Sequence, residues 1–411
     1  SKIFKVCHWA FGLKKKWFHL NKNRMIQIYY WSPFFSDIAT TKAVLNSAIS
    51  IKKYANKKYN PVIIDVFGEW KKYQVDIKTN NIEVIHLGLD KFFKKKNING
   101  FFLSRYYQLK IIFLAFMPLY KVLKKNSPDI IILHLVTSLP LLLNILFEFK
   151  TKFILRISGL PKLNLLRKLF WNIVLKKIKI ITTPTNSTKF YLKNLFPKNK
   201  IYLLRDPIIY SKNIILKRNK ENDKKNIYVS IGRLTKQKNF LFLLNVFKII
   251  IDKDKNNYLY ILGRGEDYAK LDEFIKINKL EQNIFLEGYK KNIYDYLSSA
   301  KAFILTSLWE DPGFVLLEAC YANTSIISSD CKNGPVEILG NGKNGYLYNS
   351  EITKSFMDTF KKFNEANDTE ILSKKINAKK MAKKFSFFRH YSKLNKILHN
   401  KNLNKEINFS K

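Results

Sequence analysis

The sequence predicts an α/β protein built from two successive domains, each a doubly wound parallel β-sheet. With 411 residues, the chain exceeds the roughly 250 to 300 residues at which a single hydrophobic core usually stops growing. Short apolar runs of β-type composition alternate with helix-like stretches, a pattern typical of parallel sheets covered by helices on both faces. A polar, charged segment at residues 211–226 interrupts this alternation, which then starts again.

The first domain is expected to span residues 25–210, after an N-terminal extension at residues 1–24. Within the extension, the apolar stretch Val6–Leu13 is short and runs into three lysines, so we do not interpret it as a secretory signal. Apolar runs of β-type composition give the candidate strands of this domain, which are Ile26–Tyr30, Val62–Val66, Val84–His86, Ile130–His134, Phe153–Ile157 and Ile178–Thr183. Loop and helix-like sequence follows each of them.

Two apolar stretches of the first domain need to be distinguished from membrane spans. Leu109–Leu123 is shorter than the roughly 20 residues that cross a bilayer, and Asp129–Phe149 contains several polar residues and a proline. We interpret the second stretch as a buried strand, a turn and a helix.

The second domain is expected at residues 227–375, beyond a linker at 211–226. Its candidate strands are Ile227–Ile231, Tyr258–Leu262, Ile284–Glu287, Ala302–Thr306 and Ser325–Ser328, and its candidate helices are Phe240–Ile251, Ala269–Ile277, Ile293–Ser298 and Val315–Tyr321. Because ligands of such sheets bind outside the carboxyl ends of the strands, the loops that follow these strands are the first place to look for a site.

The last segment, residues 376–411, is expected to be a basic amphipathic helix that packs back on the first domain. Apolar residues recur at helical spacing among many lysines, so one face of this helix needs a partner. The rest of the protein is the partner we expect, and an anionic membrane surface is the alternative.

The composition is strongly basic, with 74 Lys and Arg against 31 Asp and Glu and a formal net charge of +43. Such a charge attracts polyanions, including nucleic acid, anionic lipids and phosphorylated substrates. A lysine-rich bias of the whole chain is the competing explanation. The three cysteines, Cys7, Cys320 and Cys331, form no CxxC pair and no metal-ligand spacing, so they indicate neither a disulfide framework nor a zinc site, and a reducing, cytoplasmic compartment fits.

The loop after the first strand of the second domain carries two cations. Gly232 opens a turn, and Arg233 and Lys238 follow before a helix begins near Asn239. Helix-end amides together with two cations form an anion site that suits a pyrophosphate. Solvated surface lysines are the simpler interpretation of such charges in a basic chain.

The next strand ends in Gly263 and Gly265, which allow the backbone to turn closely beside a ligand. This short Gly-x-Gly lacks the third glycine of the dinucleotide fingerprint, which argues against a nicotinamide enzyme.

The segment SLWEDPGFVLLEA is the strongest chemical signal in the chain. It places Glu310 and Glu318 on either side of a Pro-Gly turn, with Glu318 on an otherwise apolar helix. A carboxylate in such a place needs hydroxyl or cationic partners, because burying it unpaired is costly. Sugar and ribose hydroxyls suit that need, and a local lysine is the alternative partner.

Taken together, these residues resemble family 4 of the retaining glycosyltransferases, which have the GT-B fold of two Rossmann-like domains facing across a cleft. The resemblance rests on the Gly-Arg pair, the lysine five residues later and the two glutamates with seven residues between them, and it is densest over residues 227–347. It implies that the first domain takes the acceptor and the second the nucleotide sugar.

The resemblance also implies roles for individual residues. Arg233 and Lys238, after Gly232, would hold the donor pyrophosphate, Glu310 the hexose, and Glu318 the ribose. Backbone amides around Gly313, Phe314 and Val315 would face the sugar and phosphate, and the backbone at Tyr289 the nucleobase. In the first domain, His134 would face the reacting sugar from the end of its strand.

One feature departs from the family. The family often has two adjacent glycines after the first strand, whereas residues 36–42 contain none, and Ser36, Thr40, Thr41 or Lys42 would have to replace them.

The resulting hypothesis is a retaining hexosyltransferase without metal or cofactor that uses a UDP- or GDP-sugar. The expected acceptor is a bacterial surface glycan, lipopolysaccharide or lipid-linked oligosaccharide, at the cytoplasmic face of the inner membrane, with lysines such as Lys94, Lys95 and Lys96 on anionic lipid. One rival is a basic protein that binds nucleic acid or membranes, although no nucleic-acid-binding motif is present. Another is a GT-B enzyme of other chemistry, such as a sugar phosphorylase or an epimerase.

Overall fold

The computed structural model describes residues 24–35, 39–93, 101–161, 165–210 and 226–399. The chain forms two compact units, residues 1–156 with 167–180, and residues 157–166 with 181–411. The expected extension at 1–24 and linker at 211–226 lie outside the described residues, apart from Arg24 and Asn226.

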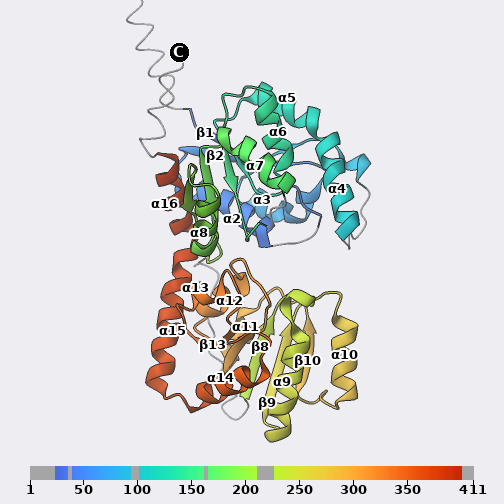
Figure 1. Ribbon diagram of the computed structural model, residues 1–411, viewed down its shortest axis with the longest axis vertical. Helices are drawn as coiled ribbons and strands as arrows, with labels where there is room; N and C mark the ends of the chain where they lie inside the picture. Colours follow the sequence, from blue (N-terminus) through green and yellow to red (C-terminus); the bar gives the residue numbers. More distant parts are fainter. Residues whose placement is uncertain (1–23, 36–38, 94–100, 162–164, 211–225, 400–411) are drawn as a thin grey trace, which may run out of the picture. The chain divides into compact units, whose positions relative to one another are not determined.

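The first sheet has seven strands in the order β3-β2-β1-β4-β5-β6-β7. Figure 1 labels β1 and β2 of this sheet and the helices α2 to α8. Their bounds are β1 Ile26–Trp31, β2 Tyr59–Asp65, β3 Glu83–His86, β4 Ile130–Leu133, β5 Lys152–Arg156, β6 Ile180–Thr183 and β7 Lys200–Leu203. The central strands are parallel, and every residue of β4 is buried, as expected for Ile- and Leu-rich strands that helices cover on both faces.

The helices between these strands are α2 Ala39–Tyr54, α3 Gln74–Thr79, α4 Phe101–Leu114, α5 Phe116–Asn126, α6 Ser138–Leu146, α7 Leu165–Lys177 and α8 Asn186–Leu195, with short 3-10 helices η2 Glu69–Tyr73 and η3 Asp90–Phe92. Right-handed crossovers put α2 and α3 on one face of the sheet and α4 to α8 on the other, because the strand order reverses direction after β3.

The second sheet has six strands in the order β10-β9-β8-β11-β12-β13. Their bounds are β8 Asn226–Ile231, β9 Asn257–Leu262, β10 Ile284–Gly288, β11 Ala302–Leu305, β12 Ser325–Ser329 and β13 Tyr346–Tyr348. All its strand pairs are parallel, so the carboxyl ends of these strands lie along one edge. The predicted fold class, two Rossmann-like parallel-sheet domains, is therefore confirmed.

The second half also contains the helices α9 Phe240–Lys253, α10 Tyr268–Ile277, α11 Tyr294–Ser299, α12 Phe314–Tyr321, α13 Pro335–Ile338, α14 Thr353–Glu365, α15 Asp368–Ala382 and α16 Phe387–Leu398, with η6 Lys236–Lys238 and η7 Lys383–Phe385. The strand order reverses after β10, so α9 and α10 cover one face and α11 to α13 the other.

The basic segment expected to form one helix over 376–411 is divided in the structure. α15 ends at Ala382, and Ser386 caps a new helix, α16, by accepting a hydrogen bond from the Arg389 amide. α16 packs against the chain that follows β7, where the His390 ring nitrogen Nδ1 lies 2.7 Å from the Arg205 carbonyl. Residues 400–411 of the expected helix lie outside the described part.

Every predicted strand is present, with both ends within three residues of the predicted ones, but β7 and β13 were not predicted. β7 and β13 are short and occupy sheet edges, where a strand needs less apolar sequence. The stretch Asp129–Phe149 is, as interpreted, a strand (β4), a turn and a helix (α6). None of the helices in the described ranges is long and apolar enough to span a bilayer.

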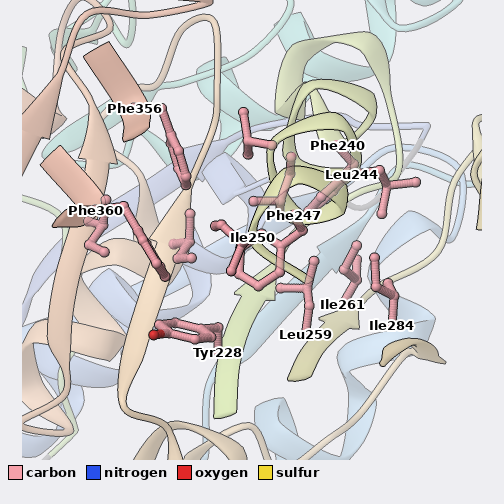
Figure 2. Packing of buried hydrophobic residues seen from close by; sticks show 14 of the residues in the cluster. Tyr228, Phe240, Leu244, Phe247, Ile250, Leu259, Ile261, Ile284, Phe356 and Phe360 are labelled. Atoms are coloured by element: carbon pink, nitrogen blue, oxygen red, sulfur yellow. The ribbon is translucent and has the colours of Figure 1, made fainter. Parts of the chain in front are cut away.

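The core on one face of the second sheet is built from aromatic and aliphatic side chains of α9, α14 and the central strands. Figure 2 shows Phe247 of α9, Tyr228 of β8 and Phe360 of α14 in one cluster. The Tyr228 ring centroid is 5.5 Å from that of Phe247 and 5.3 Å from that of Phe360. This cluster fixes α9, and with it the loop that leads from β8 into that helix.

Replacing Phe247 by Ala should lower the free energy of unfolding by about 3–5 kcal/mol, because a fully buried ring leaves a cavity in this cluster. Chemical denaturation measures the change. Ile277→Ala is the matched control: Ile277 is 71% exposed on α10, and the expected change is below about 0.5 kcal/mol. Equal losses in the two variants would contradict the assigned core.

Candidate functional site

The loop after β8 is fixed by backbone hydrogen bonds to the end of the neighbouring strand. The Gly232 amide donates to the Leu262 carbonyl at 3.0 Å, and the Leu234 amide to the Arg264 carbonyl at 3.0 Å. Leu234 is buried, whereas Arg233 between these two anchors is exposed. The backbone is therefore rigid at the point where it presents the guanidinium to solvent.

Glycines allow the loops after β8 and β9 to touch backbone to backbone. A Cβ on Gly263 would lie 1.8 Å from the Gly232 carbonyl oxygen, and one on Gly265 would lie 2.2 Å from the Leu234 carbonyl oxygen. Gly263 also has a φ of +147°, which side chains disfavour. From the sequence we expected these glycines to let the backbone turn closely beside a ligand, which stays a prediction; the structure shows that they let the neighbouring loop approach.

Lys238 meets Glu310 at the carboxyl ends of β8 and β11. The Lys238 ammonium donates to Oε1 of Glu310, and the Ser307 hydroxyl donates to the same oxygen at 2.6 Å. Both charged side chains are largely buried, with 12% of Lys238 and 6% of Glu310 exposed. Each charge is thus neutralised where water is mostly excluded, which makes the pair costly to break one partner at a time.

The two oxygens of the Glu310 carboxylate are used unequally. Oε1 receives both hydrogen bonds, and Oε2 receives none from the part of the chain that the structure describes. A carboxylate accepts several hydrogen bonds, so Glu310 keeps accepting capacity for a ligand hydroxyl.

Neighbouring loops hold the segment that carries Glu310. The Gln237 side chain donates to the Trp309 carbonyl at 2.8 Å, and the Asn333 amide donates to the Asp311 carboxylate at 3.0 Å. A Cβ on Gly334 would lie 2.2 Å from the Pro312 carbonyl oxygen, so the backbones are in contact there as well. Ser307 and Asn333 could not be predicted as site residues from the sequence, because nothing in their spacing marks them.

Glu318 lies on α12, the helix that begins just beyond this loop. Gly313, with a φ of +95°, caps α12, and Phe314 and Val315 form its first turn. Glu318 is 9% exposed. Burial chiefly, and the nearby charge of Glu318 next, raise the pKa of Tyr294, the first residue of α11, above its ordinary value.

The remaining predicted residue of this unit is Tyr289, which follows β10 and is 68% exposed. The carbonyl of Gly288 before it accepts a hydrogen bond from the Gly263 amide at 2.8 Å. The structure thus places Gly232, Lys238, Gly263, Glu310 and Gly313 on adjoining loops of one sheet edge, where the sequence predicted the site.

Cys331 lies near this edge and is buried. Burial raises the pKa of its thiol to about 12, with a further upward contribution from the charge of Glu310 and a downward one from Lys238. A thiol this far from ionisation is no nucleophile at neutral pH. No group of three or more His, Cys, Asp or Glu among the described residues is placed to hold a metal.

His134, the predicted residue of the first unit, directly follows β4. Its amide donates to the Trp31 carbonyl at 2.9 Å, and its ring centroid is 6.1 Å from that of Tyr30. These contacts place His134 at the carboxyl edge of the first sheet. Of the residues considered as substitutes for the absent glycines, Thr40, Thr41 and Lys42 lie in the first turn of α2, and Ser36 lies outside the described residues.

A charged network at the same edge was not foreseen. The His86 ring lies between two carboxylates, with Nδ1 3.1 Å from Asp65 and Nε2 2.5 Å from Asp90. Burial, and then the hydrogen bond with Asp65, raise the pKa of Glu69 well above its ordinary value. The network orders the loops after β2 and β3.

Comparison with known proteins adds family relationships. Residues 211–385 match the family of glycosyl transferases group 1. An uncharacterized glycosyltransferase of Methanocaldococcus jannaschii is 31% identical over 315 residues, which cover 71% of this chain and 73% of that protein. The amylovoran biosynthesis glycosyltransferase of Erwinia amylovora is 32% identical over 178 residues, which cover 42% of this chain and 48% of that protein.

A solved structure supports the fold. A mutant of TarM from S. aureus, in complex with fondaparinux, α-GlcNAc-glycerol and UDP, superposes with a TM-score of 0.68 at 15% identity, covering 91% of this chain and 100% of that one.

The contact between the loops after β8 and β9 can be tested by replacing Gly263 and Gly288 one at a time. Gly288→Ala should cost about 1 kcal/mol, because φ is +67° but no atom lies within 4 Å of the new Cβ. Gly263→Ala should cost about 1–3 kcal/mol more, since its Cβ overlaps the Gly232 carbonyl. Denaturant unfolding compares the two, and equal stability would show that the loops do not touch as described.

Proposed function

Because the chain belongs to the glycosyl transferases of group 1, we propose that it transfers a hexose from a nucleotide sugar to a glycan acceptor with retention of anomeric configuration. The observation that carries the proposal is the buried Lys238–Glu310 pair beside the exposed Arg233, on the carboxyl edge of the second sheet. Ligands of doubly wound sheets bind at this edge.

The Lys238–Glu310 pair suits a nucleotide-sugar donor, because the donor offers a phosphate to the lysine and sugar hydroxyls to the glutamate. Lys238 exchanges the Glu310 carboxylate for a donor phosphate, and Arg233 supplies a second cation. Both then stabilise the negative charge that develops on the departing nucleoside diphosphate. In this proposal the two side chains take the place of a metal ion.

Glu310 accepts hydrogen bonds from hydroxyls of the transferred hexose, for which its Oε2 has capacity. Amides at Gly313, Phe314 and Val315 face the sugar and phosphate at the start of α12, and Glu318 receives the ribose hydroxyls.

Two further contacts complete the assignment of the donor site. The backbone at Tyr289 meets the nucleobase. For His134, the resemblance to the family implies a role toward the reacting sugar. The packing of Gly263 against Gly232 keeps the loop after β8 in position.

A UDP-sugar is the favoured donor, with a GDP-sugar as the alternative, because the similar TarM structure holds UDP. The proposed acceptor is a bacterial surface polysaccharide, lipopolysaccharide or lipid-linked oligosaccharide. The relative from Erwinia amylovora, which acts in amylovoran biosynthesis, supports that class. Such acceptors are made at the cytoplasmic face of a membrane, where we place this protein.

The donor assignment is tested with a panel of UDP-, GDP- and ADP-sugars, measured by thermal shift and by donor hydrolysis. A UDP-sugar should raise the melting temperature of the parent protein. Arg233→Ala and Glu310→Ala should each lower turnover by about 100-fold, since each removes a contact to charge or sugar in the transition state.

The control for this panel is Lys270→Ala, which removes an exposed cation from α10 and should leave turnover unchanged. Melting temperatures without ligand separate loss of activity from loss of fold. If both site variants bind and turn over donor like the parent, the site assignment is wrong.

A further inference from the structure

The helices α4 and α5 carry apolar residues on two opposite faces. The inner stripe is fully buried and consists of Ile111, Ala115, Leu119 and Leu123. The outer stripe is more than half exposed and consists of Tyr106, Leu109, Phe113 and Met117. Phe113 is the most exposed of these, at 78%.

Single exposed apolar residues are common, but an aligned series is not. The outer residues follow one another at intervals of three, four and four, so they form a continuous strip along the helix pair. A soluble helix normally turns polar side chains to this side. We therefore expect the outer stripe to be covered by a binding partner and not by the chain's own core.

The charges around the stripe identify the kind of partner. Residues 101–127 contain no Asp or Glu, whereas Arg105, Lys121, Lys124 and Lys125 are exposed beside the apolar strip. An apolar stripe flanked only by cations is complementary to a surface with an apolar interior and anionic groups at its border.

A second helix repeats this pattern on the same side of the first sheet. In α7, Leu169 and Ile173 are exposed, and the helix has four cations and no acidic residue. α7 neighbours α6, since the Lys177 ammonium donates to the Asn144 and Ile145 carbonyls at 3.1 and 3.2 Å. The right-handed crossovers place α4 to α7 in one layer.

We infer that the outer face of α4, α5 and α7 docks on an anionic lipid bilayer, with the apolar side chains at the headgroup boundary and the cations on lipid phosphates. The inference depends on exposure and charge alone, and it holds whichever sugar the protein transfers.

Docking in this way would bring the carboxyl edge of the first sheet to the bilayer. Tyr107 of α4 packs against Phe35, which follows β1, at 5.4 Å between ring centroids, and against Phe93, which follows η3, at 6.2 Å. The membrane-facing helix is thus anchored to the edge that carries His134. If this edge binds the acceptor, which rests on the proposed function, the acceptor reaches it from the lipid phase. The docking itself does not depend on that function.

The test is co-sedimentation of the full chain with vesicles of phosphatidylcholine alone and of an equimolar mixture of phosphatidylcholine and phosphatidylglycerol. The parent should bind the mixed vesicles and bind neutral ones weakly. The double variant Phe113→Asp with Met117→Asp should bind the mixed vesicles about tenfold more weakly or worse, because two charged carboxylates replace the apolar contact. Ile277→Asp, at a position of α10 that is 71% exposed, is the matched control and should bind like the parent.

Three results would overturn the inference: a parent that ignores mixed vesicles, a double variant that binds them like the parent, or a lipid-free parent that dimerises in sedimentation velocity while the double variant is monomeric. The last would assign the face to a second copy of the chain. Donor hydrolysis in solution, which the double variant should retain, separates failure of docking from failure of the proposed function.

Discussion

The arrangement of the second domain depends on a buried ion pair between two loops that are 72 residues apart in the chain. Lys238 and Glu310 neutralise each other at the edge of the sheet, and the Ser307 hydroxyl completes the set of donors to one carboxylate oxygen. Neither charge is stable there alone, because desolvation of an unpaired charge is costly. A ligand that binds at this edge must therefore provide a new partner for each residue of the pair. A sugar diphosphate offers a phosphate anion to Lys238 and hydroxyls to Glu310.

The rest of the local structure keeps the pair in place. Gly263 lets the loop after β9 press against the loop that leads to Lys238, and Asn333 and Gly334 support the loop that leads to Glu310. Below the edge, the cluster around Phe247 fixes α9 against the sheet. The charged groups are thus held by rigid backbone, which reduces the reorganisation that binding would require.

Much of this could be predicted from the sequence, and the limits of prediction have physical causes. Central strands such as β4 and β8 are recognisable because burial on both faces demands uninterrupted apolar sequence, whereas the edge strands β7 and β13 carry no such demand. Arg233, Lys238 and the two glutamates were identified by residue type and order. Their pairing was not, nor was the part of Ser307, because contacts between distant loops leave no local pattern.

We propose that donor binding replaces the contact between Lys238 and Glu310, so that each side chain binds the donor instead of the other. A double-mutant cycle with Lys238→Met and Glu310→Gln, measured as the free energy of unfolding with and without a saturating UDP-sugar, tests it most directly. We expect a favourable coupling between the two residues in the free protein that largely disappears when the donor is bound. A coupling of the same size in both conditions would contradict it.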